Sequence, residues 1–418
     1  MSTLIIENPC QLKGTVNISC AKNAILPIIA ASLLTEDKCI LEDIAALEDV
    51  KVMVEVVNSL GADINLFNNK TLEITAHNIL NNETSYELIR KMRASFLIMG
   101  PMLARVGKIK ISLPGGCAIG SRPIDLHLKG FAAMGANITL GHGYIEAHAD
   151  RLKGDSIYLD FPSVGATENI MMAACLAEGM TVIENAAEEP EIVDLANFLS
   201  KMGAKIKGAG TDTIKIEGVK YLSGAAHAAI PDRIEAGTFM MAAAATRGDV
   251  LVDGVVPEHV KPITAKLKEM GAEVYEYEKA IRVIATERLK SVDIKTMPYP
   301  GFPTDMQSPM MSAMCVSKGT SVVTETVFEN RFMHINELKL MGAKIKVDGR
   351  SAIIEGVEKL SGAKVKATDL RAGAALIISA LCAEGRTEIS EVYHIDRGYI
   401  NIEEKMRKLG ANIMRQDS

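Results

Sequence analysis

Hydrophobic and polar positions form two different patterns along the chain. The stretch from Ala24 to Leu34 is apolar almost throughout, whereas Ala204-Lys205-Ile206-Lys207 alternates residue by residue. The apolar run is too short to cross a bilayer and predicts a buried helix, while strict alternation predicts a strand with one buried face. The recurrence of both patterns predicts an α+β protein.

A short signature divides these elements into repeats. A large apolar residue followed by Gly-Ala occurs six times, at Gly61, Gly135, Gly203, Gly271, Gly342 and Gly410. Successive glycines are about 70 residues apart, a spacing that indicates an internal repeat. A helix-like stretch precedes each glycine and an alternating stretch follows it, so the glycine is expected to end a helix in a left-handed conformation.

A second glycine marks the middle of the repeats, at Gly107, Gly179, Gly248, Gly319 and Gly385. It is expected to close an apolar helix and open a strand. Each repeat is then predicted to run helix, strand, loop, helix, strand, strand, with a threefold pattern in each half of the chain. The alternative, a coincidence of helix-ending glycines, is disfavoured because a large apolar residue precedes Gly-Ala every time.

Composition narrows the class of protein. The chain has 418 residues, 48% apolar and 23% charged, which predicts a globular protein of two or more domains. The net charge is -6, aromatic residues make up 4% and Trp is absent, so no nucleic-acid partner is expected. No signal peptide or membrane partner is expected either. Seven scattered cysteines without a CxxC pair predict no disulfide framework and no metal site, and fit a reducing cytoplasm.

The stretch from Ser112 to Pro123 is the most informative candidate site. Three glycines and two prolines surround Cys117 and Arg122, a composition that predicts a loop after a strand. A cysteine in such a loop is partly exposed, and a neighbouring arginine favours its reactive thiolate. The alternative is a small buried apolar cysteine.

Three further stretches lie at expected helix starts and combine polar residues with an apolar helix. Lys22-Asn23 can meet an anion at free backbone N–H groups, although a solvated lysine beside a cap residue is the simpler interpretation. Asp305 is a candidate general base or, equally, an N-cap. The turn Ser163-Val164-Gly165 can take a diphosphate, or be an ordinary strand-to-helix turn.

Arginines at the edges of apolar helices form the last candidate group. Arg93, Arg331, Arg371 and Arg397 are expensive to bury unless paired. Pairing with Glu329, Asp369 and Asp396 is one explanation. Binding of a small polyanion is the other, because the guanidinium fork binds carboxylate and phosphate groups bidentately.

These motifs together resemble the UDP-N-acetylglucosamine enolpyruvyl transferase family over the whole chain. No single motif decides the resemblance; their number and order do. They are Ser19 to Ala24, Met92-Arg93-Ala94-Ser95, Pro114 to Asp125, Ser163 to Thr167, Glu184 to Ala187, Pro231 to Glu235, Phe302 to Gln307, Glu325 to Met333, Thr368 to Ala372 and Tyr393 to Gly398.

The resemblance implies an inside-out α/β barrel of two similar domains, each with three repeats and buried helices. Residues 21–229 would form one domain, residues 1–20 and 230–418 the other, with the substrate cleft between them. The implied substrates are phosphoenolpyruvate and UDP-N-acetylglucosamine. No cofactor or metal is implied, and a cytoplasmic monomer is expected. The resemblance also implies alkylation of Cys117 by the epoxide antibiotic fosfomycin.

Residue roles are likewise implied by the resemblance alone. Cys117 would be the general acid and Asp305 the general base. Lys22, Arg122 and Arg397 would contact the phosphate of phosphoenolpyruvate, and Arg93 and Arg371 its phosphate or carboxylate. The other substrate contacts would be Asn23 at the tetrahedral intermediate, Arg122, Pro123, Ile124, Asp125 and Leu126 at the uridine, Ser163, Val164 and Gly165 at the diphosphate, and Thr304 and Val327 at the sugar.

Two departures and three rivals qualify this resemblance. Glu48 and Phe161 stand where some relatives carry lysine, so neither is assigned to the site. The first rival is 5-enolpyruvylshikimate-3-phosphate synthase, which shares the fold and chemistry but not the Cys117 loop or the Ser163 turn. An RNA terminal-phosphate cyclase-like enzyme would need a basic face, which the net charge disfavours. A non-catalytic scaffold would tolerate the loss of both Cys117 and Asp305.

Overall fold

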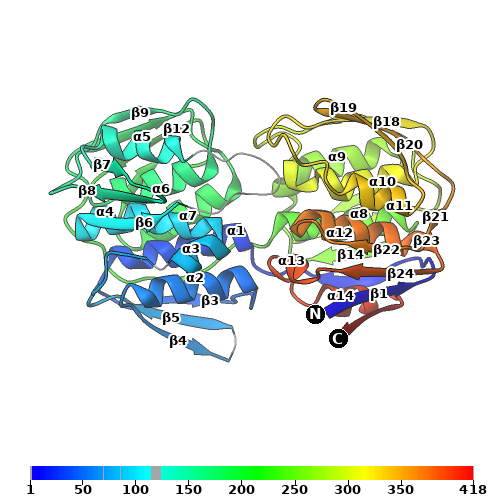
Figure 1. Ribbon diagram of the computed structural model, residues 1–418, viewed down its shortest axis with the longest axis horizontal. Coiled ribbons are helices and arrows are strands. Elements are labelled where there is room, and N and C mark those ends of the chain that lie inside the picture. The colour runs from blue at the N-terminus through cyan, green and yellow to red at the C-terminus, as the bar shows by residue number, and fades with distance from the viewer. Residues whose placement is uncertain (1, 69, 85, 114–123, 418) are drawn as a thin grey trace. The chain divides into compact units, whose positions relative to one another are not determined.

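The computed structural model describes residues 2–68, 70–84, 86–113 and 124–417, and these residues form two compact units. Unit 1 contains residues 2–19 and 231–417, and unit 2 contains residues 20–113 and 124–230. Cys117, Arg122 and Pro123 lie outside the described residues. Both units combine buried helices with small mixed sheets (Figure 1).

Three helices form the centre of unit 1: α8 (Arg233–Ala245), α10 (Gln307–Cys315) and α12 (Leu370–Leu381). They pack against one another, and every residue of α8 and α10 is buried. Their Ala- and Met-rich sequences have no polar side chains spaced to make a solvent face, and a helix that is apolar on all sides must lie inside a protein. The sequence-based prediction of buried helices is confirmed here.

Three four-stranded sheets pack against these helices, in the orders β15-β16-β14-β2, β17-β18-β20-β19 and β22-β24-β1-β25. The strands alternate between buried and exposed residues, as expected for sheets with one solvent face. Their bounds are β1 (Ser2–Glu7), β2 (Lys13–Asn17), β14 (Asp249–Asp253), β15 (Glu273–Glu276), β16 (Ala280–Ile284), β17 (Ile294–Lys295), β18 (Thr320–Thr324), β19 (Lys344–Asp348), β20 (Ser351–Glu355), β22 (Lys364–Lys366), β24 (Arg386–Ser390) and β25 (Ile413–Asp417). A two-stranded ladder joins β21 (Leu360–Ser361) to β23 (Ala383–Glu384).

Unit 1 also has a set of outer helices, which are partly exposed. These are α9 (Lys261–Glu269), α11 (Ile335–Leu340) and α14 (Ile402–Lys408), with the short helices η3 (Pro257–Val260), η4 (Thr304–Met306) and α13 (Tyr393–Asp396). The first and last strands of the chain, β1 and β25, pair antiparallel in this unit (Figure 1).

Unit 2 repeats the plan, with α1 (Lys22–Ala31), α4 (Met99–Val106) and α6 (Val164–Ala174) as its largely buried helices. Its sheets are β13-β3-β5-β4, β6-β8-β7 and β11-β12-β10-β9. The strand bounds are β3 (Cys39–Glu42), β4 (Asp63–Phe67), β5 (Thr71–Thr75), β6 (Lys108–Ser112), β7 (Asn137–Leu140), β8 (Tyr144–His148), β9 (Ser156–Tyr158), β10 (Met180–Glu184), β11 (Lys205–Lys207), β12 (Thr213–Glu217) and β13 (Ala226–Ala228). The other helices are η1 (Ser32–Leu34), α2 (Glu48–Ser59), α3 (Tyr86–Lys91), η2 (Arg93–Ile98), α5 (Asp125–Ala133) and α7 (Pro190–Lys201).

The predicted order of elements is confirmed in the first five repeats. The sixth repeat ends at β25, and the last strand of its sheet is β1 from the start of the chain. The structure also adds an edge strand that the sequence did not reveal. Among the described residues, five sheets have an edge strand that pairs in parallel with the strand after the buried helix. It comes from the preceding repeat in three of them, as β9 does beside β10. In the other two it comes from a distant part of the chain, with β13 beside β3 and β2 beside β14. In the second repeat this strand is reduced to a bridge between Glu83 and Lys110, and the chain forms α3 and η2 instead.

All six signature glycines adopt a positive φ, between 89° at Gly135 and 108° at Gly61, so the predicted left-handed helix ends are confirmed. Gly248 departs from the second pattern, because Arg247 takes the left-handed conformation there with a φ of 55°. A Cβ at Gly248 would lie 2.2 Å from the Leu12 carbonyl oxygen, so this glycine serves close approach of two backbones. No helix in the described ranges is both long and apolar enough to cross a membrane.

Candidate active site

In unit 1, the carboxylate of Asp305 is bound by two arginines from distant parts of the chain. Arg331 Nη2 donates to Asp305 Oδ1 at 2.7 Å, and Arg371 donates to Oδ2 through Nη2 at 3.0 Å and Nε at 3.2 Å. Both arginine side chains are almost fully buried, whereas a quarter of the Asp305 side chain is exposed. Asp305 is therefore a partly accessible carboxylate with charge-assisted bonds on both oxygens.

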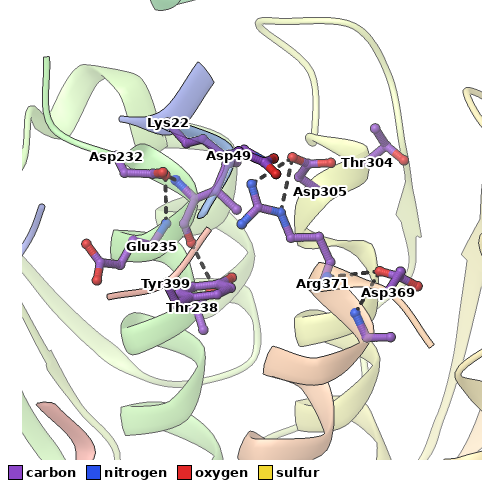
Figure 2. Close-up of polar contacts among 12 residues, drawn as sticks. Lys22, Asp49, Asp232, Glu235, Thr238, Thr304, Asp305, Asp369, Arg371 and Tyr399 are labelled. Carbon is purple, nitrogen blue, oxygen red and sulfur yellow. Dashed lines mark hydrogen bonds and ion pairs between the residues drawn. The ribbon is translucent and has the colours of Figure 1, made fainter. Parts of the chain in front are cut away.

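Asp305 is not the N-cap that one interpretation of the sequence proposed. It lies within η4, and neither η4 nor α10 receives a side-chain cap bond at its start. A different aspartate, Asp369, is the N-cap of a different helix. Its Oδ1 accepts hydrogen bonds from the backbone N–H groups of Arg371 and Ala372 at the start of α12. Figure 2 shows the Arg371 side chain extending from this helix end to Asp305.

The environment of Arg371 keeps its positive charge. Burial alone would lower the pKa of the guanidinium, but the combined negative charge of Asp305 and neighbouring groups outweighs it, and the pKa lies above its ordinary value. The guanidinium also lies over the Tyr399 ring, 5.5 Å from its centroid. Its Nη1 has no hydrogen-bond partner among the described residues. This nitrogen is itself buried, so it does not face solvent.

The other predicted residues of unit 1 lie on nearby segments of the fold. Thr304 is adjacent to Asp305 in η4 and its hydroxyl contacts Arg331 Nη1 at 3.1 Å. Val327 lies in the loop after β18, half-buried. Arg397 follows α13. Asp396, the internal partner that one interpretation gave to Arg397, directs both oxygens to Arg415, at 2.7 and 2.9 Å.

In unit 2, Lys22 is the first residue of α1, and its ammonium group contacts Asp49 Oδ2 at 3.1 Å. The exposed fractions of the two side chains are 12% and 5%, so Lys22 is not the solvated lysine that one interpretation described. The N-cap of this helix is Ala21, and Asn23 lies inside the first turn. The sequence did not reveal Asp49 as a partner, because 27 positions separate it from Lys22.

One buried side chain, Asn169 of α6, joins the elements on which the remaining predicted residues of unit 2 lie. Its Oδ1 accepts the Gly100 N–H at 2.6 Å, and its Nδ2 contacts the Phe96 carbonyl oxygen and His127 Nδ1, both at 3.0 Å. Because an amide nitrogen only donates, His127 must accept at Nδ1 and carry its proton on Nε2. Asn169 therefore ties η2 and α4 to α5.

This arrangement brings three predicted segments to the same part of unit 2. Arg93 is the first residue of η2. Ile124 precedes α5, and Asp125 and Leu126 form its first turn. Ser163 caps α6, with its hydroxyl accepting the Ala166 N–H at 3.4 Å, and Val164 and Gly165 follow. A Cβ at Gly165 would lie 3.3 Å from the His127 ring, so α5 and α6 begin close together.

The buried His127 gives a testable dependence of stability on pH. Desolvation, with a smaller contribution from Arg93, lowers its pKa from 6.5 to about 3. Protonation thus favours the unfolded chain, and the stabilisation is complete above pH 6.5 and lost as the pH falls toward 3. From about pH 7.5 to about pH 5.5, wild-type unfolding free energy is expected to fall by about 1.4 kcal/mol more than that of His127→Gln. Urea titrations at both pH values measure this difference, and equal pH dependence in the two proteins would contradict it.

The geometry described so far provides a carboxylate able to take a proton and two fixed cations able to hold an anion. Asp305 has the first property, and Arg371 and Lys22 have the second. Within the described ranges there is no group of three or more His, Cys, Asp or Glu side chains arranged to hold a metal ion.

Comparisons with known proteins identify what the chain is similar to. The family model of EPSP synthase (3-phosphoshikimate 1-carboxyvinyltransferase) matches residues 6–406. A protein named UDP-N-acetylglucosamine 1-carboxyvinyltransferase 1, from Caldanaerobacter subterraneus subsp. tengcongensis, is 65% identical over 412 residues, covering 99% of each chain. One named UDP-N-acetylglucosamine 1-carboxyvinyltransferase 2, from Carboxydothermus hydrogenoformans, is 61% identical over 417 residues, again covering 99% of each chain.

Solved structures share the fold at lower sequence identity. The enolpyruvyl transferase NikO from Streptomyces tendae matches with a TM-score of 0.90 and 24% identity, covering 100% of this chain and 99% of the other. EPSP synthase from Acinetobacter baumannii matches with a TM-score of 0.76 and 20% identity over 100% of both chains. These likenesses establish the fold class. Any inference about the substrate must come from the relatives with higher sequence identity.

Proposed function

This chain belongs to the EPSP synthase family of enolpyruvyl transferases, and on that premise we propose that it transfers the enolpyruvyl group of phosphoenolpyruvate to the 3-hydroxyl of UDP-N-acetylglucosamine, with release of phosphate. The observation that carries this choice of acceptor is the high identity, over nearly the full length, to relatives named UDP-N-acetylglucosamine 1-carboxyvinyltransferase. The shikimate 3-phosphate reaction is the second candidate, because the family model carries that name.

The proposed reaction has two steps, an addition and an elimination. In the addition, the sugar 3-oxygen bonds to carbon 2 of phosphoenolpyruvate, the hydroxyl loses its proton, and a proton is added to the methylene carbon. In the elimination, that carbon loses a proton and the carbon–oxygen bond to phosphate breaks, which restores the double bond. The enzyme must therefore supply a base for the hydroxyl, an acid for the carbon, and positive charge for phosphate and carboxylate.

Asp305 is the proposed base for the sugar hydroxyl. Support comes from its partial exposure combined with a fixed orientation, since Arg331 and Arg371 bind different oxygens of the carboxylate. A base held in this way needs little reorganisation before it accepts a proton. Thr304, next to it in η4, and Val327 are the proposed contacts to the sugar.

Cys117 is the proposed acid toward the methylene carbon, on the resemblance alone. The physical state of five of the other six cysteines is consistent with this choice. Burial raises the pKa of Cys175, Cys315 and Cys382 to about 12, and it also raises the pKa of Cys10 and Cys39. Those thiols are poor proton donors and poor nucleophiles at neutral pH.

The anionic groups of the substrates are assigned to the cations and helix starts. Lys22, Arg122 and Arg397 are proposed to contact the phosphate of phosphoenolpyruvate, and Arg93 and Arg371 its phosphate or carboxylate. Ser163, Val164 and Gly165 at the start of α6 are proposed to bind the diphosphate through backbone N–H groups. The uridine is assigned to residues 122–126, and the reaction intermediate to Asn23.

Identification of the product tests this proposal. Incubation with phosphoenolpyruvate and UDP-N-acetylglucosamine is expected to convert the nucleotide sugar into a species in which a carboxyvinyl group replaces one hydrogen, detected by mass spectrometry. Fragmentation should place the new group on the sugar. Recovery of unchanged nucleotide sugar, under conditions where shikimate 3-phosphate gains the same group, would reject the proposed acceptor and leave the family assignment intact.

The wider setting belongs to the same proposal. The proposed product, UDP-N-acetylglucosamine carrying the enolpyruvyl group, is a precursor for peptidoglycan synthesis, and the proposed setting is a cytoplasmic step of cell-wall formation. A monomer is proposed for the working enzyme. The predicted sensitivity to fosfomycin also belongs here, because it depends on Cys117.

A further inference from the structure

A buried carboxylate at the end of β18 connects the two segments of unit 1 that carry the proposed sugar contacts. Glu325 directly follows β18, and its side chain is 1% exposed. Its backbone N–H donates to the Arg350 carbonyl oxygen at 2.9 Å, which fixes the residue at the edge of the ladder. A carboxylate in such a place is stable only if its oxygens are well supplied with donors.

Four donors reach this carboxylate. Oε1 accepts the Thr296 hydroxyl at 2.8 Å and the backbone N–H groups of Val327 and Phe328 at 2.8 and 3.1 Å. Oε2 accepts the Thr304 hydroxyl at 2.9 Å. One oxygen thus shapes the loop that carries Val327, and the other binds the η4 segment that carries Thr304. No helix or strand ladder links these two segments directly.

The direction of the bonds extends this link to Asp305. Thr304 has one hydroxyl proton, and the hydroxyl donates it in the hydrogen bond to Glu325, because a carboxylate can only accept. The lone pairs of Thr304 are therefore available to Arg331 Nη1, which is 3.1 Å away. Nη2 of the same guanidinium donates to Asp305 Oδ1 at 2.7 Å. Glu325, Thr304, Arg331 and Asp305 form one chain in which each group fixes the orientation of the next.

We propose that Glu325 is a positioning residue for the transfer reaction, setting the Val327 loop directly and orienting the Asp305 carboxylate through Thr304 and Arg331. This inference rests on the proposed function, and it adds a residue that contacts no substrate. A carboxylate is needed at this position because it accepts from both segments at once. An amide of the same size would present a donor to one of them.

The test compares Glu325→Gln, Thr304→Val and the double variant in steady-state phosphate release. In Glu325→Gln, the carbonyl oxygen of the amide takes the place of Oε1 and keeps its three donors. The amide nitrogen then takes the place of Oε2 and faces Thr304. Because this nitrogen is a donor, the Thr304 hydroxyl proton must point away from it. We expect kcat to fall about tenfold or more, because a small misplacement of a reacting group has large effects. The KM for UDP-N-acetylglucosamine should rise, while the KM for phosphoenolpyruvate should stay within about threefold of wild type.

The double variant shows whether the two substitutions lower kcat through the same hydrogen bond or through independent effects. Because both substitutions break one link, the double variant should be no slower than the slower single variant, whereas independent effects would multiply. Two controls are matched by residue type: Glu355→Gln in β20, an exposed carboxylate of the same sheet, and Thr264→Val, whose buried hydroxyl has no partner among the described residues. Both controls should keep kcat within about twofold.

Three results would overturn the inference: Glu325→Gln with kcat within twofold of wild type, single effects that multiply in the double variant, or losses that match the fraction unfolded at the assay temperature. Thermal denaturation of each variant measures that fraction. If Glu325→Gln does not fold, Thr304→Val still breaks the link, and a near-normal kcat there would reject it. Failure of the proposed function would look different, because wild type and both controls would then release no phosphate, and the inference would fall with it.

Discussion

Asp305→Asn is expected to lower kcat by a factor of about 10²–10⁴, the usual contribution of a positioned general base. The amide has nearly the shape of the carboxylate but cannot take the proton of the sugar hydroxyl. The variant should therefore bind UDP-N-acetylglucosamine with an affinity close to wild type, measured by calorimetry, while phosphate release almost stops. The combination of retained binding and lost turnover is the expected result.

A stability measurement is needed beside that assay. Asparagine leaves the buried Arg331 and Arg371 facing a neutral group, so some loss of unfolding free energy is expected too. Asp249→Asn is a matched control, because Asp249 also binds an arginine, Arg282, at 2.7 Å but at an exposed position of unit 1. Its kcat should be unchanged. An Asp305→Asn protein that is folded and turns over within threefold of wild type would reject Asp305 as the base.

Cys117→Ala is expected to produce the second large effect, a loss of kcat of about 10²–10⁴ together with loss of covalent modification by fosfomycin. Alanine removes the proposed proton donor for the methylene carbon and the thiolate proposed to open the epoxide. Intact-mass spectrometry in the presence of UDP-N-acetylglucosamine should show one adduct on wild type and none on the variant.

Cys10→Ala is the control for that experiment. Cys10 is half-buried, and burial raises the pKa of its thiol, so the control should keep both its activity and the adduct. An adduct that persists in Cys117→Ala would place the reactive thiol elsewhere. Full turnover by Cys117→Ala would reject the cysteine as the acid.

The repeats were predictable because their signals are local. Each signature glycine ends a helix at a positive φ, a property that depends on a few neighbouring residues. The apolar helices α8 and α12 could likewise be read from their own sequences. Gly248 shows the limit of such reading, because its small size serves contact with Leu12, more than two hundred positions away in the chain.

The geometry of the candidate site was not predictable, since it depends on pairs that are distant in sequence. Asp305 and Arg371 are 66 positions apart, and Asn169 and His127 are 42 apart. A motif around Asp305 could not distinguish a helix cap from a carboxylate held by arginines, because both fit a position before an apolar helix. Glu325 gave no local sign of its role, which arises from the packing of Thr296 and Thr304 around it.

The domain boundaries at 20/21 and 229/230 and the substrate contacts of individual residues stay predictions. The family, the fold class and the transfer activity follow from similarity along nearly the whole chain. The variants described above test the residue roles one by one.

The choice of acceptor is the central claim, and one assay tests it most directly. Phosphate release from phosphoenolpyruvate is measured with UDP-N-acetylglucosamine and, in parallel, with shikimate 3-phosphate. We predict release with the nucleotide sugar alone, and its disappearance in Asp305→Asn. Release with shikimate 3-phosphate alone would keep the family and contradict the proposed acceptor, and release with neither would contradict the proposed transfer reaction itself.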